Sequence, residues 1–398
     1  MGVVYTEILV TLRNFLICLL LFLVWEDTEK TENYYKTDRR QFLESGPNLH
    51  KSITDLFDEY SNDSKDTCRD APIAVQLSGG LGNHLFGVAA GIELSLRRAN
   101  SIEGLFLIKV DNNDFRAHQV HPLSKTLFRR LQSVDSERDL IMLKRQRKYN
   151  EINGNTSHDN YLFANAQILG KDNHWRHWCG QSYETFLQWL NVPCGTPQIV
   201  FGYLENKDFF KTSGSILKHL FAVPENVSLM MRERYLLPLN QISSIPWAIH
   251  VRRGDYLQAS NWHNVLPLSY YEDAADMMIS NLKKHGNGGG QVFVFSDDLE
   301  WVKSQDFFLN LEGVVFVDES DTLTVFYYLI LASEGGVVCS ASTFCWWSAF
   351  LSDLGRIPNR LVIFPDKIDI EHSFSGKMGP EDCGSVLNMP YMTLLSEY

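Results

Sequence analysis

Short apolar runs and helix-spaced apolar positions alternate over the second half of the chain. Runs of strand length, from "WAIHV" to "RLVIFP", are separated by segments whose apolar residues recur every three or four positions. The pattern predicts strands at residues 247–251, 291–298, 313–318, 335–340 and 360–365, and helices at 269–286, 323–334 and 342–355. Alternation of this kind predicts an α/β fold with a parallel sheet and right-handed crossovers.

A similar alternation begins near residue 72. "IAVQLSG" (73–79) predicts a buried strand, "NHLFGVAAGIELSLRRA" (83–99) a helix that ends in two arginines, and "GLFLIKV" (104–110) another strand. The charged stretch that follows shows no clear period. We therefore expect an N-terminal lobe over residues 71–240 and a C-terminal lobe over residues 241–398.

The first 70 residues differ in character. Residues 14–25, "NFLICLLLFLVW", are apolar but span only about 18 Å as a helix, whereas residues 8–25 are long enough to cross the hydrocarbon core. We expect a transmembrane signal anchor at 8–25, a cytosolic tail at 1–7 and a luminal stem over the polar residues 26–70. A cleaved secretory signal is the alternative, although no small-residue cleavage site follows the apolar run.

Composition narrows the classes of function. The 398 residues are 44 % hydrophobic and carry a formal net charge of -12, which indicates folded domains and argues against a general nucleic-acid binder. Sequons for N-glycosylation at Asn62, Asn155 and Asn226 agree with a luminal chain. Six of the seven cysteines lie beyond the apolar run and allow up to three disulfides. We expect one of these disulfides between Cys179 and Cys194, which bracket a short loop. No spacing typical of a zinc site occurs in the sequence.

Charged and hydroxyl side chains follow three of the predicted strands. They are Arg252, Arg253 and Asp255 after the first, Asp297 and Asp298 after the next, and Ser340, Ser342 and Thr343 after a later one. Ligands of parallel sheets bind beyond the carboxyl ends of the strands, and arginine matches a diphosphate with two parallel hydrogen bonds. The two adjacent arginines point to opposite sides of an extended strand, so one is expected at a ligand and the other at an internal partner.

Ordinary structural roles compete with each of these functional interpretations. Asp298 or Ser296 is suited to capping a helix that begins at Leu299, and the two tryptophans of "FCWW" are better explained as core packing. The glycines of "SGGLGN" (78–83) are sufficient for a tight strand-to-helix turn. Their functional interpretation is that free N–H groups at the helix start face an anionic or hydroxyl-rich ligand.

Six stretches in order resemble the alpha-1,2-fucosyltransferase family, glycosyltransferase family 11. They are "GGLGNHLF", "GYLENKDFF", "HVRRGDY", "LPLSYYEDA", "FSDDLEWVK" and "STFCWWSAFL", and the resemblance extends over roughly residues 73 to 365. The short apolar N-terminus and the acidic stem are also similar to the type II Golgi topology of that family. Each stretch alone is weak evidence for the resemblance, whereas the six stretches in this order are specific to the family.

The resemblance implies a GT-B-like fold of two Rossmann-like lobes, with GDP-beta-L-fucose in the C-terminal lobe and a galactose-terminated or other glycan acceptor on the N-terminal one. It implies an inverting transfer, to O2 of galactose, that needs no metal and no cofactor besides the donor. Carried onto this chain, it makes Arg252 the ion-pair partner of the diphosphate and Asp255 a base or an orienter of the arginines. His250 and Arg253 would shape the donor site, and Ser342 and Thr343 would contact phosphate. From the sequence pattern we also place Asp297, Gly80, Gly82 and Asn83 on the donor side, with Asp297 in contact with either a ribose or an arginine.

Some positions depart from the family's pattern. His84 stands where glutamine is usual, and Cys345 stands where serine is usual before the tryptophans. An acidic residue is expected at the start of the helix before the last motif, where this chain has Tyr327 or Tyr328, with Asp321 earlier. These departures make a catalytically inactive glycan- or nucleotide-binding relative a rival function. A protein O-fucosyltransferase is a further rival, because it would use the pair of arginines in the same way.

Overall fold

The computed structural model describes residues 72–77, 79–99, 105–108, 132–134, 167–169, 183–193, 196–201, 204–236, 245–261, 263–285, 290–353, 359–368, 387–396 and 398. Residues 61–398 form one compact unit. The predicted tail, anchor and stem, the sequons at Asn62 and Asn155 and the pairing of Cys179 with Cys194 lie outside the described residues. Within the described part, no helix has the length and apolar character needed to cross a membrane.

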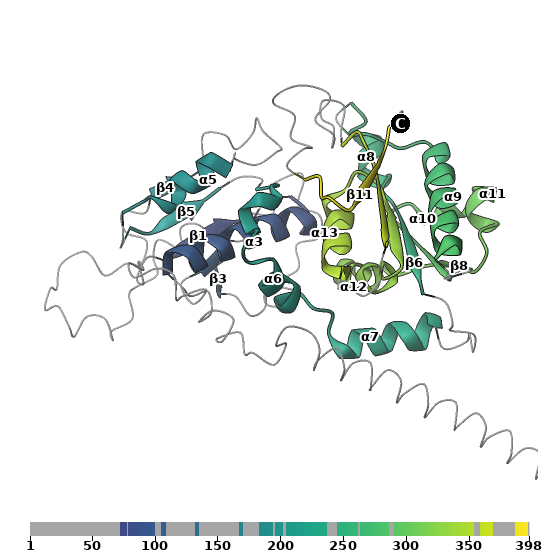
Figure 1. Ribbon diagram of the computed structural model, residues 1–398, viewed down its shortest axis with the longest axis horizontal. Helices are drawn as coiled ribbons and strands as arrows, with labels where there is room; N and C mark the ends of the chain where they lie inside the picture. The colour runs from purple at the N-terminus through teal and green to yellow at the C-terminus, as the bar shows by residue number, and fades with distance from the viewer. Residues whose placement is uncertain are drawn as a thin grey trace, which may run out of the picture. The chain divides into compact units, whose positions relative to one another are not determined.

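Two parallel sheets organise this unit (Figure 1). The first has the order β3-β2-β1-β5-β4 and contains β1 (Ile73–Gln76), β2 (Leu105–Ile108), β3 (Gln132–Val134), β4 (Gln167–Leu169) and β5 (Gln198–Val200). The second has the order β11-β10-β9-β6-β7-β8 and contains β6 (Trp247–Val251), β7 (Val292–Ser296), β8 (Val314–Phe316), β9 (Gly336–Cys339), β10 (Leu361–Pro365) and β11 (Met392–Leu395). Every strand pairing is parallel, as the sequence predicted.

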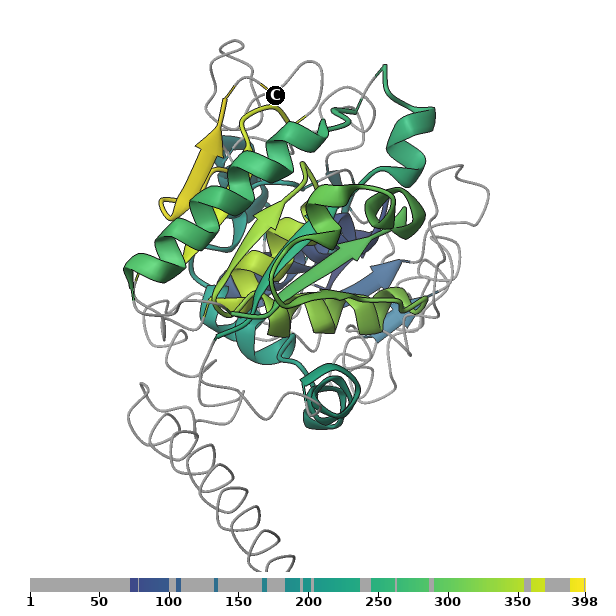
Figure 2. The same cartoon turned by 90° about the vertical axis from the view of Figure 1, so that its right-hand side faces the viewer.

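Helices connect the strands of both sheets. Around the first sheet and along the chain that follows it lie α3 (Leu81–Ala99), α5 (Tyr183–Leu190), the 3-10 helix η4 (Lys207–Phe210), α6 (Gly214–Leu220), α7 (Glu225–Met231) and the π-helix η5 (Arg232–Leu236). The second sheet carries α8 (Gly254–Gln258), α9 (Leu268–Lys284), α10 (Leu299–Lys303), α11 (Asp306–Leu309), α12 (Thr322–Ala332) and α13 (Thr343–Ser352). Figure 2 shows these helices on both faces of the second sheet.

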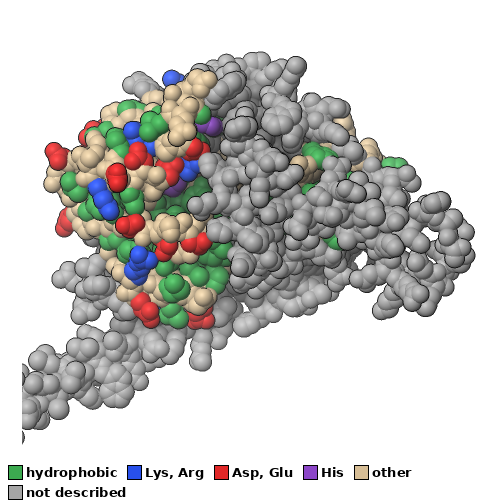
Figure 3. Space-filling view, turned by 180° about the vertical axis from the view of Figure 1, so that it is seen from behind, with side chains coloured by type: hydrophobic (Ala, Val, Ile, Leu, Met, Phe, Trp, Pro, Cys, Tyr) green, Lys and Arg blue, Asp and Glu red, His purple; other side chains and the backbone are tan. Residues whose placement is uncertain are grey.

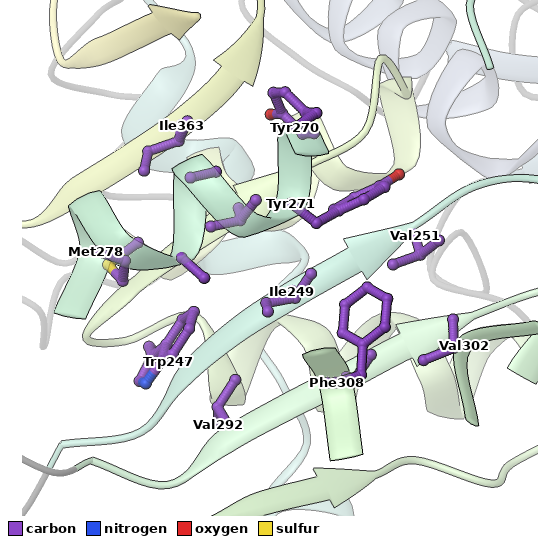
Figure 4. Close-up of a cluster of buried hydrophobic side chains, with 14 of the residues drawn as sticks. Trp247, Ile249, Val251, Tyr270, Tyr271, Met278, Val292, Val302, Phe308 and Ile363 are labelled. Atoms are coloured by element: carbon purple, nitrogen blue, oxygen red, sulfur yellow. The ribbon is translucent and has the colours of Figure 1, made fainter. Parts of the chain in front are cut away.

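Alternation along β6 sets the two faces of the second sheet. Trp247, Ile249 and Val251 point into a buried cluster with side chains of α9, α10 and α11, where Tyr271 and Phe308 also lie (Figure 4). The even-numbered residues face the opposite layer, where α12 and α13 contact β6 and β9. Side chains of β6 therefore alternate between the cluster with α9, α10 and α11 and the layer of α12 and α13, and both sets are buried.

Helix α3 packs tightly on the first sheet. A Cβ added at Gly91 would lie 2.6 Å from Cγ2 of Val75, so a glycine at this position lets the helix approach the strand. Buried Glu93 pairs with Arg97 at 2.8 Å and accepts a hydrogen bond of 2.8 Å from the backbone N–H of Ser213. The last turn of α3 is thereby tied to the segment before α6.

An aromatic cluster joins α3 and η4 to α13. Phe86 lies 4.9 Å from Trp346 and 5.0 Å from Trp347 between ring centroids, and Phe210 lies 5.1 Å from Trp347 and 5.8 Å from Phe350. Both tryptophans are almost fully buried. The prediction that they serve core packing is confirmed.

Candidate active site

The carboxyl ends of β6, β7 and β9 bring the predicted charged and hydroxyl groups together. Arg252 follows β6 directly, and its guanidinium forms ion pairs of 2.7 Å with Asp255 and 2.9 Å with Asp297. Its side chain is 25 % exposed, so solvent still reaches it. Asp297 was expected to contact either a ribose or an arginine, and in the structure it contacts this arginine.

Arg253 has a different set of partners. Its guanidinium lies 3.7 Å from the ring centroid of Trp301, its Nε lies 3.3 Å from Asp298, and its backbone N–H donates to Asp297 at 2.9 Å. Asp298 also accepts a hydrogen bond from the backbone of Trp301 and caps α10, as predicted. The two guanidinium groups thus reach separate partners, although the side chain of Arg252 and the backbone of Arg253 both contact Asp297. The contacts of Arg253 with Trp301 and Asp298 were not predicted from the sequence.

Ser340 ties the ends of β6 and β9 together. Its hydroxyl donates to the carbonyl of His250 at 2.8 Å and accepts from the backbone N–H of Arg252 at 2.8 Å. The hydroxyl of Tyr271 lies 2.9 Å from the same oxygen. Both residues that flank the strand end are therefore fixed by one buried hydroxyl.

The first turn of α13 is unlike the first turns of α10 and α12. Asp298 and Asp321 cap those two helices with their side chains, whereas Ser342 is the N-cap of α13 and makes no side-chain cap hydrogen bond. Helix N-termini carry orphan N–H donors and a partial positive charge. An anion at this turn would satisfy those donors.

A buried histidine with a ring nitrogen unpartnered in the described part of the chain indicates a ligand at the same place. The ring of His250 is only 6 % exposed and stacks on Phe344 in the first turn of α13, with 5.7 Å between centroids. Burial, reinforced by the charge of Arg252, lowers the pKa of His250 to about 4, so the ring is neutral at physiological pH. Its Nδ1 has no hydrogen-bond partner among the described residues.

The glycine loop meets α13 from the other sheet. Gly79 has a φ of 75°, which favours glycine, and a Cβ added at Gly82 would lie 2.5 Å from the backbone N of Phe344. Asn83 Oδ1 accepts a hydrogen bond of 2.5 Å from the Thr343 hydroxyl. Gly82 and Asn83 therefore reach the candidate site, whereas the carbonyl of Gly80 accepts the N–H of His84 inside the first turn of α3.

Two residues at the site were not singled out from the sequence. Tyr256 on α8 is stacked on His263 with 4.1 Å between centroids, and its hydroxyl donates to the Ala341 carbonyl at 3.0 Å. Burial raises the pKa of Tyr256 above its usual range against the opposing charge of Arg252, and the carboxylates of Asp255 and Glu205 raise it further. Glu205 is buried and follows β5, so its place at the sheet edge was readable only once β5 was located.

The positions that depart from the resembling family also have defined surroundings. Asp321 accepts two hydrogen bonds from Thr324 as the cap of α12, and Tyr327 and Tyr328 are buried. Burial lowers the pKa of His84 to about 4. The Asp321 carboxylate is thus occupied by the helix it opens.

The charged side chains of this cluster carry a net negative charge, which does not attract an anion. The carboxylates of Asp255, Asp297 and Asp298 outnumber the guanidinium groups of Arg252 and Arg253 by one. On the face shown in Figure 3, acidic and basic side chains are likewise interspersed among apolar ones. A diphosphate would have to compete with carboxylates for Arg252, with help from the N-terminus of α13.

Known proteins resemble most of the chain. The O-antigen biosynthesis glycosyltransferase WbnK of Escherichia coli is 23% identical over 303 residues, which cover 73% of this chain and 93% of that protein. The alpha-1,2-colitosyltransferase of Escherichia coli is 25% identical over 295 residues, which cover 71% of this chain and 89% of that protein. A solved structure of an Arabidopsis thaliana FUT1 mutant in complex with GDP matches with a TM-score of 0.38 and 15% identity, over 82% of this chain and 77% of that one.

Residues 73–364 match the family model described as "Glycosyl transferase family 11". That span contains both sheets except β11 and the last residue of β10, and it contains every residue of the candidate site. It contains all six of the sequence stretches that carry the resemblance. The chain therefore belongs to glycosyl transferase family 11.

Proposed function

We propose that the protein transfers L-fucose from GDP-beta-L-fucose to a hydroxyl group of a glycan, with inversion at the anomeric carbon. Family membership supports the reaction class. The observation that carries the proposal is the meeting of Arg252, the N-terminus of α13 and the unpartnered Nδ1 of His250 at one edge of the second sheet. The name of a relative, alpha-1,2-colitosyltransferase, supports an alpha-1,2 linkage and keeps colitose open as a second donor sugar.

The proposed chemistry is a single displacement at C1 of the sugar. The acceptor oxygen forms a bond to C1 as the bond from C1 to the diphosphate oxygen breaks, and the electron pair of that bond leaves with GDP. Arg252 and the N–H groups of α13 stabilise the charge that develops on the diphosphate. A carboxylate takes the proton of the acceptor hydroxyl, and Asp255 is the candidate because it lies beside Arg252.

The acceptor and the cellular setting are proposed from the sequence. We propose galactose O2 as the attacking hydroxyl and a type II Golgi topology, with residues 8–25 as the anchor and no metal requirement. Asn226 of the third sequon is exposed in the first turn of α7, which agrees with modification in the lumen. Protease protection of the luminal part in intact vesicles tests the topology, and endoglycosidase sensitivity tests the glycan.

Transfer by the purified full chain to an acceptor array tests the proposed activity. GDP-fucose and GDP-colitose are supplied in parallel, with and without EDTA, and the linkage of each product is determined. We expect alpha-1,2-linked fucose on galactose-terminated acceptors and no loss of rate with EDTA. Binding of GDP without transfer would favour the inactive relative, and a labelled polypeptide would favour protein O-fucosylation.

A further inference from the structure

A disulfide closes the loop between β9 and α13. Cys339, the last residue of β9, is bonded to Cys345 in the first turn of α13, with 5.7 Å between the two Cα atoms and a sequence separation of 6. Both side chains are fully buried. The bridge therefore encloses residues 340–344 and joins a strand end to a helix start covalently.

The enclosed loop contacts each part of the candidate site. Ser340 holds the end of β6, and the carbonyl of Ala341 accepts the hydroxyl of Tyr256 from α8. Thr343 donates to Asn83 of the glycine loop, and Phe344 packs on His250. A displacement of this loop would therefore alter the surroundings of Arg252 and His250 together.

The bridge supplies a restraint that the N-cap side chain does not. Ser342 makes no side-chain cap hydrogen bond, so the first turn of α13 is not held at the N-cap in the way that Asp298 holds α10. The Cys345 side chain lies within that first turn and is anchored through sulfur to the strand. The N–H donors of the turn are thereby fixed relative to the end of β9. The ring of His250, whose buried Nδ1 has no hydrogen-bond partner among the described residues, stacks on Phe344 of the same turn.

We propose that the Cys339–Cys345 disulfide is a positioning element for the diphosphate of the donor, an inference that rests on the proposed function. It holds the first turn of α13 at the distance from Arg252 at which one diphosphate reaches both. Opening the bridge weakens binding of GDP and of GDP-fucose more than it slows the chemical step. Neither cysteine touches the donor, and both act through the loop that they enclose.

The test compares the full-length protein with its Cys345→Ser variant. Peptide mapping without reductant first establishes that the bridge exists, and its absence would overturn the proposal. Calorimetric titration then measures the Kd for GDP, and initial rates give KM for GDP-fucose and kcat. We expect Kd and KM to rise at least about fivefold, with kcat changing less than about twofold.

An α13 variant with an intact bridge provides the matched control. Ala349→Gly weakens the same helix without touching the enclosed loop, and we expect it to leave the Kd for GDP within about twofold. If Cys345→Ser binds GDP as the unaltered protein does, the bridge is purely structural and the proposal is wrong. If the unaltered protein binds no GDP, the proposed function fails as well.

If the Cys345→Ser variant does not fold, two further samples keep the proposal testable. The double variant Cys339→Ala/Cys345→Ser leaves no lone thiol in the loop. Alternatively, folded unaltered protein is treated with a water-soluble phosphine, which gives its electron pair to the S–S bond and takes oxygen from water while two thiols form. Weaker GDP binding that recovers on reoxidation supports the proposal, and unchanged binding after verified reduction contradicts it.

Discussion

The hydroxyl of Thr343 donates a hydrogen bond of 2.5 Å to Oδ1 of Asn83, although 260 positions separate the two residues. Thr343 begins α13 on the second sheet, and Asn83 lies in the first turn of α3 on the first sheet. Gly82 permits this contact because its missing side chain leaves room for the backbone of Phe344. The candidate site therefore depends on contact between the carboxyl edges of two sheets.

Substitution of Gly82 tests that contact. In Gly82→Ala the added Cβ would lie 2.5 Å from backbone atoms of Thr343 and Phe344, so α3 and α13 must separate. Overpacking of this kind costs about 1–3 kcal/mol of stability. We expect a lower free energy of unfolding in urea and at least about a tenfold loss of transfer rate.

Gly214→Ala is the matched control for this substitution. Its added Cβ would meet only Cζ of Phe350, at 3.7 Å, which is ordinary van der Waals contact, and the residue begins α6. Stability should stay the same or rise slightly, since alanine favours helix, and transfer should be unchanged. Equal behaviour of the two alanine variants would contradict the proposed close approach.

The two adjacent arginines should respond differently to lysine. The planar guanidinium of Arg252 contacts two carboxylates and has donors left for a diphosphate, whereas a lysine ammonium lacks this forked geometry. Arg252→Lys should therefore lower the transfer rate on the order of a hundredfold. Arg253→Lys loses the planar stacking of the guanidinium on Trp301 and should cost about 1 kcal/mol of stability with a smaller loss of rate. Steady-state kinetics and urea unfolding of both variants decide between these roles. A larger rate loss for Arg253→Lys would reverse the assignment.

Much of the second sheet was predictable from the sequence because its strands and helices are long and strongly apolar. The predicted helix at 269–286 is α9 at 268–284, and the predicted strand at 247–251 is β6. In contrast, β4 and β5 have three residues each, too few for a period to be recognised. They are defined by pairing with one another and with β1, which only the folded chain provides.

The site likewise has a part that the sequence predicts and a part that depends on the folded chain. The residue types after β6, β7 and β9 could be read from the sequence because strand ends converge in any parallel sheet. The stacking of Arg253 on Trp301 and the pairing of Cys339 with Cys345 could not, because they depend on the angle at which a helix leaves its strand. With six cysteines available, spacing alone left fifteen pairings open.

Acid should destabilise the protein through its buried histidines. Burial lowers the pKa of His84 and of His250 to about 4, whereas the unfolded chain has values near 6.5. Between these pH values the unfolded state binds protons that the folded state does not, so stability falls as the pH falls from about 6.5 to 4. The loss at pH 5 should be on the order of 2 kcal/mol for each histidine.

Urea unfolding at pH 7.5 and pH 5 measures this dependence. The variant His84→Gln keeps a side chain of similar size that does not titrate, so the difference between the two pH values should shrink by the share of one histidine. The comparison uses the pH difference within each variant, and a general change in stability therefore cancels. An unchanged difference would show that His84 is not buried in its neutral form.

Removal of the Asp255 charge separates its two candidate roles. Asp255 lies 2.7 Å from Arg252 and competes with an incoming diphosphate, so Asp255→Asn should tighten GDP binding by about two- to fivefold, as expected for a partly exposed ion pair. If Asp255 also accepts the acceptor proton, kcat should fall on the order of a hundredfold or more, because an amide cannot take up that proton. Asp298→Asn is the control. Asparagine caps α10 as well as aspartate does, and Asp298 forms its ion pair with Arg253 and not with Arg252. Tighter GDP binding with unchanged kcat would make Asp255 an orienter of Arg252, and weaker GDP binding would contradict the competition between Asp255 and the diphosphate.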